Sequence, residues 1–194
     1  MPKVFLVGDS VRMGYDRYVR DHFSGQAEVY YPADNCRFAQ YVLRHFHEWV
    51  EKECDPKTVN VVHWNAGLWD TGRLFEDEPL TPLDAYVEML RRVSQRIRVV
   101  CPGARQIFAT STPVVEAQYA QPERFFRYNA DIVRYNQAAC ALMETLGVAV
   151  DDLHAVASRL PGSAWSDATH LYTETGTRAL GEAVCAAIRA ALGT

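Results

Sequence analysis

The chain has 194 residues, which is typical of one domain that buries a hydrophobic core, and 48% of them are hydrophobic, as in ordinary soluble proteins. The formal net charge is −4 and lysine and arginine form no run, which excludes the basic footprint of proteins that track nucleic acid phosphates. A membrane span needs about eighteen consecutive apolar residues, and every apolar stretch of this sequence is much shorter. The apolar run 4–7 is also too short for the core of a signal peptide. We therefore expect a single cytoplasmic domain, residues 1–194, with neither nucleic acid nor a membrane as partner and with its oligomeric state open.

The cysteines are odd in number, widely spaced and free of any Cys-x-x-Cys pair: Cys36, Cys54, Cys101, Cys140 and Cys185. This pattern predicts neither a disulfide framework nor a zinc site. Cys140 and Cys185 lie among apolar residues at helical spacing, which favours small buried side chains over reactive thiols. The sequence therefore predicts no metal site, and we expect no cofactor.

Short apolar or β-branched runs alternate with helical patterns along the chain. We predict strands at residues 3–8, 28–31, 58–64, 105–110 and 147–152. Helical spacing between them marks apolar faces that we expect to pack on the sheet: Phe38, Tyr41, Val42, Phe46, Trp49 and Val50; Leu83, Tyr86, Val87, Leu90, Val93, Ile97 and Val100; Ile132, Val133, Ala139, Cys140, Met143 and Leu146; and Leu180, Val184, Ile188 and Leu192. The alternation predicts an α/β fold of three α/β/α layers around a flavodoxin-like, five-stranded parallel sheet, in which the third strand lies beside the first.

Two segments are longer than the connections of α/β proteins usually are. Residues 65–82 follow the third predicted strand and residues 111–126 follow the fourth, so both leave the carboxyl ends of strands. Ligands of open α/β sheets bind in the crevice beyond these ends. The two loops therefore indicate a shaped substrate site at this edge, the alternative being surface decoration.

The sequence Gly8-Asp9-Ser10 follows directly after the first predicted strand. A serine at this point lies at the ligand-binding edge of the sheet, where it can present a nucleophile to substrate. A Gly-Asp-Ser turn can equally begin a helix, with Ser10 as the capping residue. This segment alone leaves both interpretations open.

A nucleophilic serine needs a base, and His170 is the candidate among the histidines. It stands three residues after Asp167 in the segment 165–176, just before a predicted helix start at 173–175. This spacing lets one turn of chain direct the Asp167 carboxylate to Nδ1 of His170, which leaves the other ring nitrogen to take a proton from serine. The alternative is a helix-entry cap with a chance histidine. The other histidines are expected on helix surfaces (His22, His45, His47), hydrogen-bonded in the core (His63) or without an obvious partner (His154).

An acyl-transfer site also needs hydrogen-bond donors for the oxyanion. Asn65 lies at the tip of the third predicted strand, beside the first, so its amide can donate toward Ser10. Asparagine also ends strands for conformational reasons alone, and that alternative stays open. Residues 32–41 leave the second strand and enter a helix, where free backbone N–H groups form a natural anion site.

These segments, in this order, resemble the blocks of the GDSL/SGNH hydrolase superfamily over nearly the whole chain. The family carries its nucleophile in an N-terminal Gly-Asp-Ser block, matched by Ser10, and an Asp-x-x-His pair near the C-terminus, matched by Asp167 and His170. Its Asn-bearing block is usually Gly-x-Asn-Asp and is matched at Asn65, although His63 stands where the family has glycine. The resemblance implies the SGNH hydrolase fold and a serine esterase.

The second block of the family supplies an oxyanion-hole N–H from a glycine. By position this glycine falls at Arg37, within Asn35-Cys36-Arg37, and any residue except proline offers the same backbone N–H. The resemblance thus implies an oxyanion hole made of the N–H groups of Ser10 and Arg37 and the side-chain amide of Asn65.

Three segments are most similar to the branch of the family that removes acetyl groups from sugars: "NCRFAQY" (35–41), "HWNAGLWD" (63–70) and "STPVVE" (111–116). Trp69 and Trp165 fall on loops beside the predicted site. Their faces could stack on a sugar ring, although tryptophan on a loop also serves as a packing anchor.

We therefore predict a serine ester hydrolase that removes short acyl groups, acetyl above all, from a carbohydrate or similar polar substrate through a triad of Ser10, His170 and Asp167. The chain lacks the Gly-x-Ser-x-Gly elbow of α/β-hydrolases and the glycine motifs of nucleotide sites. One alternative is a lysophospholipase or thioesterase that acts on longer acyl chains. The other is a non-catalytic carbohydrate- or nucleotide-binding protein, because a fold alone does not determine function.

Overall fold

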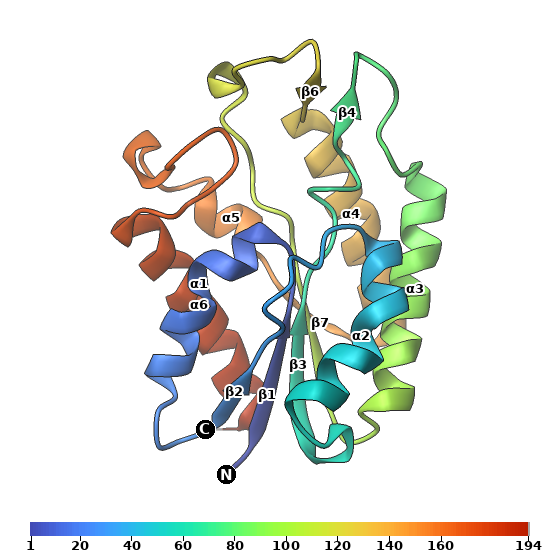
Figure 1. Cartoon of the computed structure of the whole chain (residues 1–194), viewed down its shortest axis with the longest axis vertical. Coiled ribbons are helices and arrows are strands. Elements are labelled where there is room, and N and C mark those ends of the chain that lie inside the picture. The colour runs from blue at the N-terminus through green and yellow to red at the C-terminus, as the bar shows by residue number, and fades with distance from the viewer. Residues whose placement is uncertain (194) are drawn as a thin grey trace.

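The computed structural model describes residues 1–193, and its centre is a five-stranded parallel sheet (Figure 1). The strand order is β2-β1-β3-β5-β7, and consecutive neighbours pair in parallel. The strands are β1 (Lys3–Val7), β2 (Glu28–Tyr30), β3 (Val59–Trp64), β5 (Arg105–Ala109) and β7 (Ala149–Asp151). The predicted strands and the predicted neighbourhood of the first and third are confirmed, and each predicted boundary lies within about two residues of the observed one.

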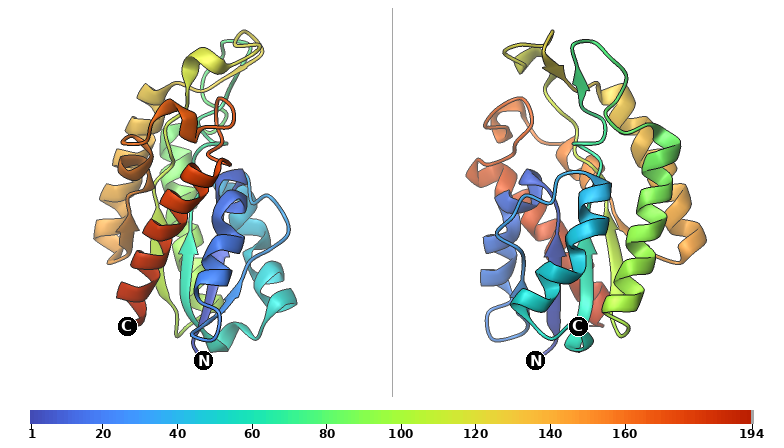
Figure 2. Two further views of the ribbon diagram at one scale, coloured as in Figure 1. Left: turned by 90° about the vertical axis from the view of Figure 1, so that its left-hand side faces the viewer. Right: turned by 45° about the vertical axis from the view of Figure 1, so that its right-hand side comes forward.

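Helices cover both faces of the sheet, which confirms the predicted three layers (Figures 1 and 2). One face carries α1 (Ser10–His22) and α6 (Glu174–Leu192), which lie side by side. The other carries α2 (Ala39–Glu53), α3 (Leu83–Val100) and α4 (Asn129–Leu146). The short elements are α5 (Leu153–Ala157) and the 3-10 turns η1 (Pro56–Thr58), η2 (Glu116–Gln118) and η3 (Gly162–Ala164). Every helix within residues 1–193 is too short or too polar to span a membrane.

The apolar core has two parts because side chains of each strand alternate between the faces of the sheet. Phe5 and Trp64 pack toward α2, α3 and α4, whereas Leu6 and Val61 pack toward α1 and α6. The predicted helical faces supply most of the rest, although Val133 is 39% exposed rather than in the core as expected. It lies on the outer side of α4, next to Ile132, which takes the inward position.

Helix α1 gave no apolar face in the sequence because part of its buried side is charged. Arg12 is 1% exposed, and its Nη1 lies 2.6 Å from Oδ2 of Asp16, one turn further along the helix. Its Nη2 donates to the backbone oxygen of Asp34 in the loop after β2, at 2.6 Å. A buried ion pair with additional hydrogen bonds is tolerated in a core, but it hides the apolar periodicity that marks a helix.

The two long loops that leave β3 and β5 contain a small sheet of their own that the sequence did not indicate. Strand β4 (Arg73–Leu74) pairs antiparallel with β6 (Phe125–Phe126), at the end of the molecule beyond the carboxyl ends of the main strands (Figure 1). Two-residue strands carry too little periodicity to be recognised. Their pairing joins segments 65–82 and 111–126 into one structure above the sheet edge.

Asp70 anchors the first of these loops to the start of α2. The N–H of Ala39 lies 3.2 Å from Oδ2 and 3.4 Å from Oδ1 of Asp70, and the N–H of Thr81 donates to the Asp70 backbone oxygen at 3.1 Å. Asp70 is fully buried, and this burial raises the pKa of its carboxyl to about 6 although hydrogen bonds from Thr81 and Ala39 oppose the rise. A carboxyl at the N-terminus of a helix thus secures the loop that follows β3.

The raised pKa of Asp70 predicts that its contribution to the free energy of unfolding decreases as the pH rises. The folded protein keeps the Asp70 proton up to a pH of about 6, whereas the unfolded chain releases it near 3.8, so the contribution is full below 3.8 and is lost as the pH rises through about 6. Asp70→Asn, which stays neutral, should flatten this part of the profile. Urea unfolding of both proteins between about pH 4 and about pH 7 measures the difference. Parallel profiles would show that another group carries the shift.

Candidate active site

Ser10 is the first residue of α1, three residues after the end of β1. The residue that caps this helix is Asp9, whose Oδ1 accepts a hydrogen bond from the N–H of Val11 at 2.9 Å. The alternative interpretation of Ser10 as the cap is therefore wrong. Since Asp9 caps the helix, the Ser10 hydroxyl is free for another partner.

That partner is His170, from the other end of the chain. Nε2 of His170 lies 2.8 Å from Oγ of Ser10, and Nδ1 lies 2.8 Å from Oδ2 and 3.0 Å from Oδ1 of Asp167. The structure thus brings together the three residues that the sequence nominated, in the order hydroxyl, imidazole, carboxylate. The His170 side chain is 26% exposed and that of Asp167 is 54% exposed, so the group is open to solvent on the carboxylate side.

The Asp167 carboxylate also shapes the loop that carries it. Its Oδ1 accepts the N–H of Thr169 at 2.7 Å and the N–H of His170 at 2.9 Å. Partial burial raises the pKa of Asp167, but the hydrogen bonds from Thr169 and His170 outweigh this effect and lower its pKa below the usual value. Asp167 is therefore ionised at neutral pH, as a carboxylate that orients an imidazole must be.

The loop is closed at its base by the start of α6. Thr173 caps the helix by accepting the N–H of Gly176 at 3.2 Å, and its hydroxyl donates to the backbone oxygen of Ala164 at 2.8 Å. A Cβ at Gly176 would lie 2.6 Å from the backbone oxygens of Ala164 and Leu171, so only glycine fits there. This close packing fixes the segment 164–173 on the end of α6.

Asn65 lies at the tip of β3, where its N–H donates to the backbone oxygen of Val7 at 3.0 Å. Its side chain is packed so closely on Gly8 that a Cβ at Gly8 would clash with Oδ1 of Asn65. Gly8, two residues before Ser10, is therefore required by the close approach of the Asn65 side chain.

Asp9, the residue between Gly8 and Ser10, is fully buried. Burial raises the pKa of its carboxyl, against the opposing effects of the Val11 N–H, the Arg127 and Arg12 cations and the Asn65 side chain. The Asn65 amide has two N–H groups, so a contact with Asp9 leaves one for a substrate oxygen.

Arg37 has the left-handed backbone conformation that favours glycine, with φ of 46°. The N–H of the preceding residue, Cys36, donates to the backbone oxygen of Gly8 at 3.1 Å, which holds this segment against the Ser10 turn. The Arg37 N–H itself donates to Oδ1 of Asn35 at 3.1 Å. The expectation of free N–H groups in residues 32–41 is thus wrong in part, because Asn35 occupies that of Arg37 and Asp70 that of Ala39.

The two predicted sugar-stacking tryptophans differ in their surroundings. Trp69 is half-buried, with its ring centroid 5.5 Å from that of Phe38 and the Arg37 guanidinium 6.0 Å above it. Trp165 is half-buried against the core beneath α6, and its buried Nε1 has no hydrogen-bond partner in the described structure. Trp69 therefore adjoins the Arg37 segment, whereas Trp165 packs mainly as an anchor of the loop before Asp167.

His63, which stands in place of the family's glycine, is fully buried beneath α1. Its Nε2 lies 2.9 Å from Oδ2 of Asp151, and the Tyr15 ring meets it edge to face at 6.3 Å. The prediction of a hydrogen-bonded core histidine is confirmed. His154, expected to lack a partner, lies with Nδ1 3.5 Å from the Ser158 hydroxyl.

Two residues beside the triad were not found from the sequence. Arg127 is 6% exposed, and its Nε donates to the backbone oxygen of Leu68. Its Nη1 lies 3.4 Å from the hydroxyl oxygens of Tyr119 and Thr169. It thereby joins both long loops to the loop of His170. Tyr172 contacts Ser10 and His170. A single arginine or tyrosine in a loop carries no periodic signal, and only the long polar loops indicated that such contacts would exist.

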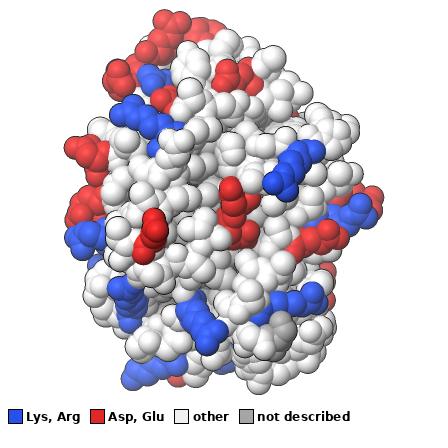
Figure 3. Space-filling view, turned by 180° about the vertical axis from the view of Figure 1, so that it is seen from behind, with Lys and Arg blue, Asp and Glu red and all other residues white. Residues whose placement is uncertain are grey.

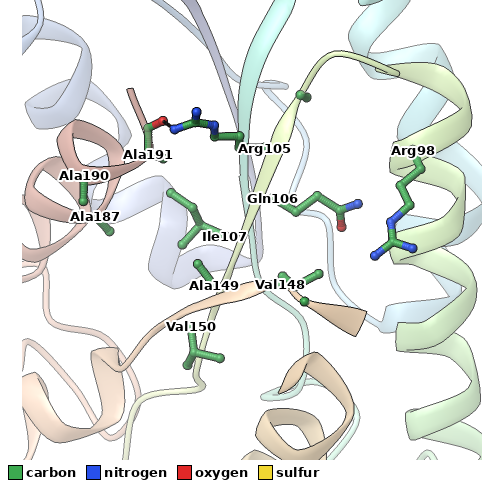
Figure 4. A pocket seen from close by; sticks show the side chains of 12 residues that line it. Arg98, Arg105, Gln106, Ile107, Val148, Ala149, Val150, Ala187, Ala190 and Ala191 are labelled. Atoms are coloured by element: carbon green, nitrogen blue, oxygen red, sulfur yellow. Dashed lines mark hydrogen bonds between the residues drawn. The ribbon is translucent and has the colours of Figure 1, made fainter. Parts of the chain in front are cut away.

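A hollow of about 480 Å³ is lined by Phe38, Tyr41, Leu80 and Thr81, among others, and the Phe38 ring contacts that of Trp69. Another, of about 500 Å³, lies at the opposite end of the sheet between α3, β5, β7 and α6 (Figure 4). In this second hollow Arg105 donates to the Ala191 backbone oxygen, and the lining is otherwise mostly alanine, valine and isoleucine. The first hollow lies between the start of α2 and the loop after β3, on the side of the candidate site, whereas the second lies away from that site.

No protein-family model and no curated protein sequence matches the chain. Its structure is similar to that of the lipase/acylhydrolase from Enterococcus faecalis, with a TM-score of 0.74 and 18% identity over 98% of this chain and 96% of the other. It is also similar to an acetyl xylan esterase, with a TM-score of 0.74 and 16% identity over 96% and 99%. A GDSL-like lipase from Bacteroides thetaiotaomicron has a TM-score of 0.70 and 16% identity over 97% and 88%.

These similarities extend over most or nearly all of each chain. They agree with the fold that the four sequence blocks predicted. The chain has the fold of the GDSL/SGNH hydrolases.

Proposed function

We propose that this protein is a serine esterase that removes short acyl groups, acetyl above all, from a carbohydrate or similarly polar alcohol. The observation that carries the proposal is the contact of 2.8 Å between Nε2 of His170 and Oγ of Ser10, with Asp167 on the far side of the imidazole. A hydroxyl bonded to an imidazole that a carboxylate orients is the arrangement that activates serine as a nucleophile.

In the first half of the reaction Oγ of Ser10 attacks the carbonyl carbon of the ester while His170 takes the hydroxyl proton. The tetrahedral intermediate collapses when the bond to the alcohol breaks and the His170 imidazolium gives that proton to the departing oxygen. Water then attacks the acyl-serine, with His170 again as base, and releases the acid and free Ser10. The Asp167 carboxylate stabilises the imidazolium in both halves.

The negative charge on the carbonyl oxygen needs donors in place before the reaction starts. Ser10 lies at the first position of α1, where its N–H has no acceptor within the helix. The Asn65 amide is held beside it by Val7 and Gly8. The Arg37 N–H is the third donor, and it serves only after the bond to Asn35 opens or is shared with the oxyanion.

Charge and aromatic side chains near the site support a polar substrate. Glu76, Asp77 and Glu78 are exposed on the first long loop, and acidic side chains are prominent at that end of the molecule (Figure 3). Trp69 and Phe38, with the hollow that Phe38 lines, offer an aromatic surface next to the Arg37 segment. Aromatic faces with a few polar groups suit a sugar ring. The similar acetyl xylan esterase structure supports the same substrate class.

A specific observation favours a second candidate, hydrolysis of longer acyl chains. Leu74 is 40% exposed and Phe75 is 72% exposed at the tip of the β4 ribbon, and such apolar side chains could contact an acyl tail. The similar lipase/acylhydrolase structure supports this alternative. A non-catalytic binding protein is disfavoured by the contact between Ser10 and His170, which binding alone does not require.

The first test is covalent labelling of the nucleophile. A fluorophosphonate should label one serine, Ser10, and Ser10→Ala should abolish the labelling and lower kcat by roughly 10⁴-fold or more. His170→Ala should slow labelling strongly because the hydroxyl loses its base. Mass spectrometry of the labelled peptide identifies the serine. Stoichiometric labelling of a different serine, with Ser10→Ala still active, would overturn the assignment.

The second test separates the two substrate classes. With 4-nitrophenyl esters of increasing acyl length, kcat/KM should be highest for acetate and fall toward the octanoate, because the first long loop exposes Glu76, Asp77 and Glu78, which suit a polar substrate better than a long acyl chain. Phe75→Ser should leave this order unchanged. A steady rise of kcat/KM with acyl length, abolished by Phe75→Ser, would replace the acetylesterase proposal with the long-chain one.

The third test distinguishes the side-chain donor from the backbone donor of the oxyanion hole. Asn65→Ala removes a donor and should lower kcat by roughly a hundredfold or more, about 2.7–4 kcal/mol, with little change in KM. Arg37→Gly keeps its N–H and should retain most of kcat, since glycine adopts the left-handed conformation readily. Steady-state kinetics on one acetyl ester compares the folded variants. If Asn65→Ala keeps nearly the wild-type kcat and Arg37→Gly is inactive, Arg37 contributes through its guanidinium rather than through its backbone N–H.

A further inference from the structure

Tyr172 makes two contacts that join the segments of the candidate triad. Its hydroxyl donates to the backbone oxygen of Ser10 at 2.6 Å. Its ring stacks on the His170 imidazole, with centroids 4.6 Å apart and an angle of 24° between the planes. One side chain thus contacts both the residue proposed as nucleophile and the residue proposed as base.

The ring is seated on α1 because of a glycine. A Cβ at Gly14 would lie 2.7 Å from Cδ1 and Cε1 of Tyr172, so any larger residue would displace the ring. Gly14 lies one turn after Ser10, which aligns the tyrosine along the first turn of the helix. The position of Tyr172 is therefore fixed by α1 below it and by His170 beside it.

This link matters because the Ser10 turn and the His170 loop are 160 residues apart in the chain. Among the described residues, the contact of His170 with Oγ of Ser10 and the contact of Tyr172 with the Ser10 backbone are the hydrogen bonds that join segment 165–173 to segment 8–16. The first is made and broken in each catalytic cycle. The second involves no reacting atom and persists throughout.

We propose that Tyr172 is a positioning residue, which keeps the His170 imidazole in a fixed position relative to the first turn of α1 while protons are transferred. The proposal rests on the proposed function of Ser10 and His170. The hydroxyl fixes the distance between the segments, and the stacked ring limits rotation of the imidazole out of line with Oγ. Misplacement of a base by a fraction of an ångström is enough to slow proton transfer.

If Tyr172 only stabilised the fold, its replacement would lower the melting temperature without a specific loss of kcat. Tyr172 is 44% exposed, so its loss removes much less apolar area than loss of a core tyrosine. Tyr18 offers a matched comparison, because its ring packs over Gly181 of α6 as Tyr172 packs over Gly14, and stacks on His22 with centroids 6.3 Å apart. Tyr18 lies two turns further along α1, away from Ser10.

The test compares Tyr172→Phe, Tyr172→Leu, Gly14→Ala and the control Tyr18→Leu in the full chain. Tyr172→Phe keeps the stacking and loses one hydrogen bond, so kcat should fall about 3- to 10-fold. Tyr172→Leu loses both contacts and should lower kcat by roughly a hundredfold, with KM unchanged. The decrease in kcat for Gly14→Ala should lie between those of the two Tyr172 variants. Tyr18→Leu should lower the melting temperature and leave kcat unchanged.

The rate of fluorophosphonate labelling of Ser10 should follow the same order as kcat, since the probe needs the base but not the natural substrate. Retention of wild-type kcat and labelling by folded Tyr172→Leu would overturn the proposal. So would a rise in KM at constant labelling rate, which would make Tyr172 a substrate contact.

Failure of the proposed function is a separate outcome, in which wild-type protein neither hydrolyses esters nor reacts with the probe at Ser10. The NMR signals of the His170 ring then still test the positioning. We expect one sharp set in the wild type and Tyr18→Leu, and exchange-broadened or doubled signals in Tyr172→Leu. Identical sharp signals in all of them would contradict the proposal.

Discussion

The candidate site depends on the parallel arrangement of the strands, which brings connections from distant parts of the chain to one edge of the sheet. Because β1 and β3 are parallel neighbours, the turn with Ser10 and the tip with Asn65 leave the sheet side by side. Helix α6 begins at the same edge and packs along α1, so the loop that precedes it places His170 beside Ser10. The candidate site residues Ser10, Asn65, Asp167 and His170 all lie outside the strands, in the connections that follow them or at the start of a helix.

Several buried charged groups secure these connections. Asp9 caps α1, Asp70 holds the start of α2, and Arg127 joins three loops, each with little or no exposed surface. Burial disfavours the charged forms of Asp9 and Asp70 and thereby raises the pKa of both carboxyls. Such groups cost stability unless they are well bonded, and they fix loop geometry more specifically than apolar contacts do.

The features predicted correctly from the sequence are those that hydrophobic periodicity or a short sequence motif indicates. Strand positions followed from apolar runs, and the contacts among Ser10, His170 and Asp167 followed from one strand-end serine and one Asp-x-x-His spacing. A helix was expected at His22, but the apolar face of α1 was not recognised because its buried side holds Arg12 and Asp16. Val133 was misassigned because helical spacing alone does not fix which neighbour faces inward. The β4–β6 pairing, Arg127 and Tyr172 depend on contacts between distant segments, for which one sequence holds no signal.

The central proposal is that Ser10 forms a covalent acyl intermediate with His170 as its base. Rapid acid quenching during turnover of an acetyl ester, followed by mass spectrometry of the digested protein, tests it most directly. We predict an acetyl group on the peptide that contains Ser10, which accumulates most when deacylation is slow and is absent in Ser10→Ala and strongly reduced in His170→Ala. Turnover without any acylated serine, or with acylation at another residue, would contradict the account.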